Sequence, residues 1–228
     1  MIEKLYNIRF ELFFFSQLAV LFGSLIFPEL FFEEILSPIL FIINLIAGII
    51  LLYKKKVLMG FCLLLLLINT IIFGADLFKN PQSIVYSFTK MISYFLFYII
   101  VTYEIIKQVW LSKTVNKNVI IGLISGYVSL GLIGFFICVS IELSSPGSFN
   151  FVDLNELKSS NSMVDDIMYF SYMTLITIGF GDIYPLTELA KKAAILIGLL
   201  GQFYLVIITA IVVGKYLNQL EQSRKDTT

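Results

Sequence analysis

The sequence predicts an all-α membrane protein with six transmembrane helices and one shorter, re-entrant helix. Three observations support this fold class. The chain of 228 residues is 58% hydrophobic, and its mean hydropathy is +0.91. Only 14% of its residues are charged, whereas ordinary soluble domains carry roughly 25%. Finally, six long apolar segments follow one another, and a short glycine-containing segment separates the last two.

A helix needs about 20 apolar residues to cross the hydrocarbon core of a bilayer. The predicted spans are Ile8–Phe27, Pro38–Tyr53, Val57–Ala75, Ile84–Ile106, Val119–Ile141 and Leu189–Leu217. A seventh apolar run, at about Ile167–Ile178, is too short to cross. We expect it to be re-entrant, because backbone at membrane depth must be sheltered by protein or water.

The basic residues predict the orientation of these spans. With the N-terminus in the cytoplasm, the residues inside are Lys4, Arg9, Lys54, Lys55, Lys56, Lys107, Lys113, Lys117, Lys215, Arg224 and Lys225. Only Lys79, Lys158, Lys191 and Lys192 then lie outside. The positive-inside rule therefore predicts a multi-pass protein of the cell membrane with both termini in the cytoplasm.

Composition also excludes several function classes. The chain has no histidine, which rules out a histidine-based zinc site or general base. Its two cysteines, Cys62 and Cys138, lie in apolar runs and are expected to be buried thiols. No pair of carboxylates is expected to face another inside the membrane, so we predict no enzymatic activity. The formal net charge of zero gives no indication of nucleic-acid binding.

The segment with the clearest chemistry is MTLITIGFGDIYP, residues 173–185. Upstream, Ser162, Asp165 and Asp166 suit a helix start, and this helix should end near Leu175 or Ile176. The negative end of its dipole would then favour a cation. Two glycines follow, and glycine readily adopts left-handed backbone angles that turn successive carbonyls to one side. Such a row replaces the hydration shell of an ion. One chain supplies one row, so we expect a homotetrameric pore.

The hexapeptide Thr177-Ile178-Gly179-Phe180-Gly181-Asp182 resembles the T-V-G-Y-G-D filter of the potassium channel family. The likeness runs without gaps over roughly residues 165–214. It implies that the carbonyls of Thr177, Ile178, Gly179 and Phe180, with the Thr177 hydroxyl, coordinate K⁺. Gly181 and Asp182 would support this filter, and the Tyr169 hydroxyl is expected to hydrogen-bond to Asp182.

The chain departs from the family pattern around the filter. Tyr169 and Phe170 stand where the family usually has a tryptophan pair, and Met173 stands where some members have glutamate. Ile176 replaces a frequent threonine, and Phe180 lacks a hydroxyl. The resemblance therefore implies selectivity for potassium over sodium, with few hydrogen bonds behind the filter.

The same resemblance implies a domain organisation, which is similar to the voltage-gated-like branch of the family. Residues 1–110 would form a four-helix module resembling a voltage-sensor domain without gating arginines. A cytoplasmic linker, 111–118, would follow, then a pore domain, 119–217, and a short cytoplasmic tail, 218–228. The polar stretch Lys107–Asn118 could form a surface helix with Trp110 as an interface anchor. Lys90, the one basic residue of the span Ile84–Ile106, is expected to be an anchor, so voltage sensing should be weak or absent.

In the last span, Gly201 aligns with the hinge glycine of the family, and close packing against a neighbouring helix is an equal alternative. Helical spacing predicts a cavity-lining face, made up of Gln202, Leu205, Thr209 and Val213. Gln202 would face this cavity or bond to the back of the re-entrant helix. In the fifth predicted span, Gly122 and Gly126 form a G-x-x-x-G pattern that permits a close helix contact.

The sequence leaves two alternatives to a potassium channel: a non-selective cation channel and a potassium transporter subunit. The expected partners of the potassium channel are the lipid bilayer, K⁺ ions and three further copies of the chain in a homotetramer. Nothing in the sequence indicates a soluble ligand, and no cofactor is expected apart from K⁺ as the permeant ion.

Overall fold

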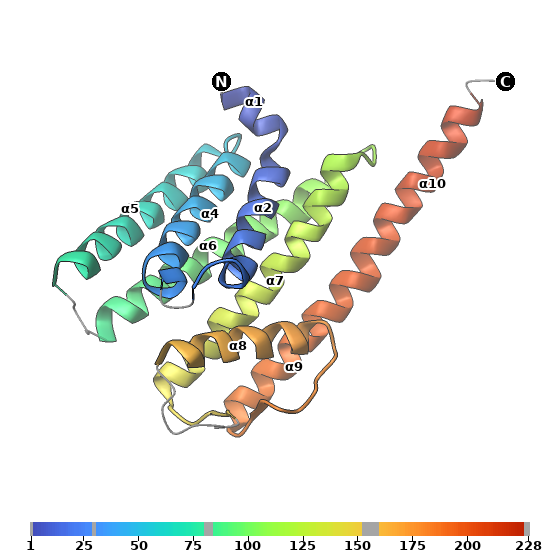
Figure 1. Cartoon of the computed structure of the whole chain (residues 1–228). Coiled ribbons are helices and arrows are strands. Elements are labelled where there is room, and N and C mark those ends of the chain that lie inside the picture. Colours follow the sequence, from blue (N-terminus) through green and yellow to red (C-terminus); the bar gives the residue numbers. More distant parts are fainter. Residues whose placement is uncertain (1, 29–30, 80–83, 152–159, 226–228) are drawn as a thin grey trace.

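The computed structural model describes residues 2–28, 31–79, 84–151 and 160–225, and most of these are helical (Figure 1). The elements in the first half are α1 (Ile2–Asn7), α2 (Arg9–Phe22), η1 (Gly23–Leu25), the π-helix η2 (Phe32–Leu36), α4 (Ser37–Leu51), α5 (Lys56–Lys79) and α6 (Ile84–Leu111). Those in the second half are α7 (Lys117–Ser144), β1 (Phe149–Asn150), α8 (Ser160–Leu175), β2 (Tyr184–Pro185), α9 (Glu188–Phe203), the π-helix η3 (Tyr204–Ile208) and α10 (Thr209–Lys225).

Four helical segments in the described part of the chain are long and apolar enough to cross a membrane. They are Lys56–Gly74, Phe88–Leu111, Lys117–Ser144 and Glu188–Gln222. The first two predicted spans contain shorter helices, α2 with 14 residues and α4 with 15 residues. An all-α membrane protein is therefore supported, and the number of six spans stays a prediction.

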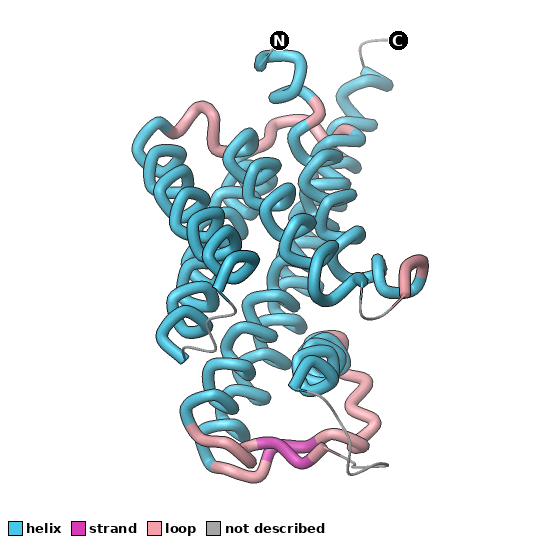
Figure 2. The backbone as a smooth tube through the Cα atoms, turned by 60° about the vertical axis from the view of Figure 1, so that its left-hand side comes forward, coloured by secondary structure: helices cyan, strands magenta, loops and turns pink. Residues whose placement is uncertain are grey.

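The helices lie in two groups on either side of α7. Helices α2, α4, α5 and α6 form a bundle against one side of α7, and the continuous helix α9–η3–α10 lies on the other (Figure 1). Both ends of the chain lie at one end of the molecule, as an even number of crossings requires. Helix α8 lies across the opposite end, close to the short strand pair β1–β2 (Figures 1 and 2).

Buried polar side chains join the bundle to α7. Asn44 on α4 accepts a hydrogen bond from the Tyr98 hydroxyl at 2.7 Å and donates to Ser16 Oγ at 2.8 Å. Gln17 on α2 donates to Ser129 Oγ on α7 at 2.7 Å. All five side chains are buried. Because a polar group without a partner is expensive in an apolar environment, these bonds favour one arrangement of the four helices.

The close contact predicted for the glycines of α7 is confirmed. A side chain at Gly126 would collide with the hydroxyl of Tyr204, and one at Gly122 would come within 3.2 Å of Phe10 and Val109. Helix α7 can therefore closely approach both the bundle and the continuous helix α9–η3–α10, which is called the inner helix below. The Tyr204 hydroxyl uses this proximity to donate to the Leu123 carbonyl at 2.6 Å.

Several predicted boundaries differ from the structure. Helix α6 continues to Leu111, so Trp110 belongs to its last turn, and residues 112–116 are not helical; the predicted surface helix is wrong. Helix α10 runs on to Lys225, because nothing in the sequence after Leu217 breaks a helix. Helix α8 begins at Ser160, so Ser162 is not its N-cap. The end of the predicted tail, 226–228, and Lys158 lie outside the described residues.

Candidate functional site

The candidate site is the loop that follows α8. This helix ends at Leu175, as predicted, and side-chain hydrogen bonds hold it against α7. Ser171 Oγ donates to the Gly131 carbonyl and the Tyr172 hydroxyl to the Val128 carbonyl, each at 2.8 Å. The end of α8 is thus fixed in position, and the loop starts from a rigid point.

The N–H groups of the first loop residues bond back to α8. Thr177 N–H donates to the Thr174 carbonyl at 3.1 Å. Those of Ile178 and Gly179 both donate to the Met173 carbonyl, at 3.0 Å and 3.2 Å. Three successive donors therefore face the last turn of α8, which accounts for its otherwise unpaired carbonyls.

The loop backbone alternates between left-handed and ordinary conformations. The φ angles of Thr177, Gly179 and Gly181 are 59°, 54° and 77°, whereas those of Ile178 and Phe180 are not positive. Thr177 is the only non-glycine residue with a positive φ in the described part of the chain. This conformation costs a residue with a Cβ about 1–2 kcal/mol, and such strain concentrates at functional sites.

The carbonyl groups of this loop are available for binding. Those of Thr177, Ile178, Gly179 and Phe180 accept no hydrogen bond from any residue that the structure describes. All four residues are exposed in the single chain. Backbone angles that alternate in this way can turn successive carbonyl oxygens to one side. Such a row of acceptors suits a dehydrated cation.

Two adjacent residues of the inner helix contact this region. Gln202 Nε2 donates to Thr177 Oγ1 at 3.1 Å, so its amide bonds to the loop itself rather than to the back of α8. Beside it, a side chain at Gly201 would come within 3.0 Å of the Leu175 carbonyl carbon and even closer to its oxygen. Close packing at Gly201 is therefore present, whereas the structure does not test a hinge there.

The predicted cavity face does not follow a regular helix. Gln202, Leu205, Thr209 and Val213 are all exposed in the single chain. The π-helix η3, however, lies between Gln202 and Thr209 and adds about one residue to its turn. The regular spacing that grouped these four residues is therefore interrupted, and Thr209 and Val213 are rotated relative to Gln202.

At the outer end of the loop, the expected hydrogen bond is present. The Tyr169 hydroxyl donates to Asp182 Oδ2 at 2.7 Å, which joins the middle of α8 to the loop after Gly181. This bond is the main reason why the pKa of Asp182 is below its ordinary value of 3.8, and the Ile183 N–H also contributes. The same bond raises the pKa of Tyr169.

Tyr169→Phe is expected to lower the stability of the folded protein at neutral pH and to weaken the dependence of that stability on pH. Because the pKa of Asp182 is lowered in the folded protein, the stabilisation from its carboxylate is present at neutral pH and lost as the pH falls through that lowered pKa. Without the hydroxyl, the pKa of Asp182 returns toward its ordinary value, so less of this stabilisation is present at neutral pH and less is lost on acidification. Thermal stability of the variant and the wild type, compared at neutral pH and as the pH is lowered through 3.8, checks this. Tyr184→Phe, an exposed tyrosine of β2, is the control, and an equal shift in both variants contradicts the prediction.

Sequence reasoning missed the residues that position the far end of the loop. Glu142, buried at the end of α7, accepts hydrogen bonds from Gly147 N–H at 2.7 Å and from Phe149 N–H at 3.1 Å. These bonds place β1, which pairs with β2 in the register Phe149↔Pro185. In the sequence, the only feature that could have indicated this positioning role of Glu142 is a carboxylate near the end of an apolar span.

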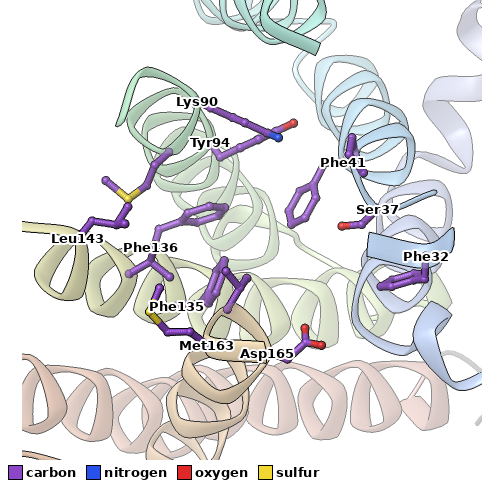
Figure 3. Close-up of a pocket in the computed structure, with 14 residues that line it drawn as sticks. Phe32, Ser37, Phe41, Lys90, Tyr94, Phe135, Phe136, Leu143, Met163 and Asp165 are labelled. Carbon is purple, nitrogen blue, oxygen red and sulfur yellow. The ribbon is translucent and has the colours of Figure 1, made fainter. Parts of the chain in front are cut away.

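Lys90, the predicted anchor, lines a cavity between the bundle and the helices around the loop. Figure 3 shows Lys90 beside Tyr94, with Asp165 at the α8 side of this cavity of about 390 Å³. Most of the other lining side chains are apolar or aromatic, such as Phe41 and Phe136. The Lys90 side chain therefore lies at a junction between helices of the protein rather than facing lipid alone.

Comparison with known proteins agrees with the position of this site. Residues 123–218 match a family model described as an ion channel. No curated protein and no solved structure matches the chain. The matched segment contains most of α7, all of α8, the loop and most of the inner helix. It supports an ion-channel domain in this part of a membrane-embedded protein, and hence passive ion conduction.

Proposed function

We propose that the chain is one subunit of a homotetrameric, potassium-selective channel of the cell membrane. The observation that carries this proposal is the loop backbone, in which four consecutive carbonyls, from Thr177 to Phe180, accept no hydrogen bond within the described chain. Four copies around one axis would bring four such rows together, so that the carbonyls at each level form a ring of four oxygens. An ion between two rings would have eight oxygen ligands, which replace the hydration shell of K⁺.

The exposed side chains of the loop support assembly with further copies. In the single chain, Ile178 is 50% exposed and Phe180 is 70% exposed. Their apolar surface would be covered if neighbouring subunits packed around the loop. We expect purified protein to have the mass of four 25.9-kDa chains, which native mass spectrometry measures directly.

Ion flux from liposomes tests the proposed selectivity. Purified protein in liposomes should pass K⁺ far faster than Na⁺ under matched gradients, and protein-free liposomes are the control. Equal flux of both ions would instead identify a non-selective cation channel. Accumulation against a gradient would identify a transporter subunit.

The same recordings test the expected weakness of voltage sensing. One charge that crosses the whole membrane is worth about 2.3 kcal/mol per 100 mV, and known sensors move three or four charges in each subunit. Lys90 is the one basic residue of its predicted span and lies in a cavity between helices. We propose that both termini are cytoplasmic and that conductance changes little with voltage; a steep dependence abolished by Lys90→Gln would contradict this.

A further inference from the structure

A second cavity lies at the opposite end of the molecule from the loop, where both termini are found. It has a volume of about 510 Å³ and lies between the start of α2, the turn after α4, the end of α6 and the start of α7. Its charged lining residues are Arg9, Lys54, Lys55, Glu104 and Lys107. Neither the family match nor the proposed conduction pathway assigns a role to this cavity.

The cavity carries an excess of positive charge. Four cations and one carboxylate line it, a net formal charge of +3 from 4 − 1. In the part of the chain that the structure describes, no carboxylate lies within 4.0 Å of Arg9, Lys54, Lys55 or Lys107. Lys54 instead lies over the Tyr6 ring at 4.8 Å. Glu104 offsets only one of these four cations, and the remaining positive charge would attract an anion into the cavity.

Hydrogen-bond donors in the cavity are already oriented. Arg9 Nε donates to Gln108 Oε1 at 3.1 Å, and its Nη1 donates to the Tyr6 carbonyl at 2.9 Å. The guanidinium also stacks on the Tyr6 ring at 4.1 Å. These contacts hold the group in place and leave its other N–H donors available. A planar, pre-oriented guanidinium beside several ammonium groups is suited to the oxygens of a phosphate.

The helix ends around the cavity favour an anion as well. Asn116 and Val119, at the positive N-terminal end of α7, line it, and Asn116 Oδ1 accepts from Val119 N–H at 3.1 Å. The negative C-terminal end of α6 is nearby, but its Trp110 carbonyl accepts a hydrogen bond from Lys215. Lys215 also donates to the Ser112 carbonyl at 2.9 Å, so these acceptors do not oppose an anion.

We propose that this cavity binds a phosphate-bearing anion, either the headgroup of an anionic lipid or a phosphate from solution. Basic pockets between transmembrane helices at the cytoplasmic side bind such headgroups. The neighbouring side chains of α6 place the cavity near the membrane surface: Trp110 is 49% exposed and Leu111 is 66% exposed. Exposed tryptophan next to basic residues is typical of the interface between lipid and water.

Binding here would also act on the inner helix, a consequence that rests on the proposed channel function. The cavity is lined by Ser112 and Asn116, at the two ends of the linker between α6 and α7. The same linker holds the inner helix, because Val115 N–H donates to Gln219 Oε1 at 2.9 Å and Lys215 bonds to Ser112. An anion that fixes the linker would therefore stabilise its contacts with α10.

The single tryptophan of the chain, Trp110, allows binding to be measured without ion conduction. It lies three residues after Lys107, one helical turn away. Full-length protein in phosphatidylcholine vesicles is titrated with brominated phosphatidylglycerol or with brominated phosphatidylcholine, and quenching of Trp110 fluorescence gives the relative affinity. The anionic lipid should bind more tightly, and its preference should fall as salt is raised.

Paired variants then locate the binding site. Lys55→Gln with Lys107→Gln removes two charges from the cavity lining, and should weaken binding by about fivefold for each lysine. Lys56→Gln with Lys113→Gln removes two charges from the same end of the molecule but outside the lining, and should have little effect. Equal thermal stability of both variants verifies folding, and Lys54→Gln with Lys55→Gln replaces the first pair if it does not fold.

The outcomes separate the two sources of phosphate. Selective loss of phosphatidylglycerol preference in the cavity variant supports a lipid headgroup. If inorganic phosphate displaces the brominated lipid, and the cavity variant weakens this effect while the control variant does not, the same site binds a soluble phosphate. The proposal is overturned if the protein shows no preference for the anionic lipid and no effect of phosphate. It is also overturned if both variant pairs lose the same amount of anion binding. These results do not depend on potassium flux, so a failure of the channel assay leaves them interpretable.

Discussion

Gly201→Ala is expected to lower both the thermal stability of the protein and its potassium flux. The added Cβ would lie within 3.0 Å of the Leu175 carbonyl carbon and closer still to its oxygen. That oxygen belongs to the last residue of α8 and also accepts the Tyr127 hydroxyl at 3.4 Å. Backbone cannot move aside as a flexible side chain can, and such overpacking typically costs about 1–3 kcal/mol. Thermal unfolding and liposome flux measure the two effects.

Gly214→Ala is the matched control for this change. Gly214 lies in the same continuous helix, and a Cβ there meets no atom within 4 Å in the chain. Alanine in its place should be neutral or stabilising, by up to about 1 kcal/mol, because of its higher helix propensity. If Gly201→Ala unfolds at the same temperature as Gly214→Ala but no longer conducts ions, Gly201 acts as a hinge rather than as a packing site. If neither variant differs from the wild type, both interpretations fail.

Gly179→Ala is expected to abolish the proposed preference for potassium while leaving the rest of the fold in place. Gly179 has a φ of 54°, and alanine in this conformation costs about 1–2 kcal/mol. No atom lies within 4 Å of an added Cβ in the single chain, so the effect should come from the backbone angle. As the peptide relaxes, its carbonyl leaves the row between Ile178 and Phe180, and the ion loses a ligand.

The ratio of K⁺ to Na⁺ flux measures this effect, and every 1.4 kcal/mol of lost discrimination is about tenfold in that ratio. Gly147→Ala is the control, because Gly147 also has a positive φ, 83°, with no atom within 4 Å of an added Cβ. It lies in the turn after α7, away from the row of carbonyls. Gly147→Ala should introduce a similar backbone strain but leave the ratio of K⁺ to Na⁺ flux unchanged. Unchanged selectivity in Gly179→Ala would contradict the proposed site.

The parts of the site that could be predicted are those set by residues close together in the chain. The end of α8 near Leu175 follows from the apolar run and the glycines after it, and the structure agrees. The Tyr169–Asp182 hydrogen bond spans 13 residues, and its prediction came from the resemblance of this segment to the potassium channel filter. Positive φ angles at Gly179 and Gly181 follow from the residue type, because glycine has no Cβ.

Other features depend on which helices meet, and no local pattern indicates them. The π-helix η3 occurs where Tyr204 bonds to the Leu123 carbonyl, 81 positions earlier in the chain, and it interrupts the spacing from which the cavity face was predicted. The bond from Gln202 to Thr177 likewise became visible only with the inner helix packed beside the loop.

The sequence by itself determined that the chain belongs in lipid and that a glycine-containing loop lies between its last two long apolar segments, because composition and backbone freedom are properties of the residues. Only the tertiary structure decided where that loop is held and which charges meet. Arg9, Lys54 and Lys107 come from three distant segments, and their common cavity exists only because the start of α2, the turn after α4 and the end of α6 lie at the same level. Packing brings such groups together through contacts between whole helices, and these contacts leave no short-range pattern in the chain.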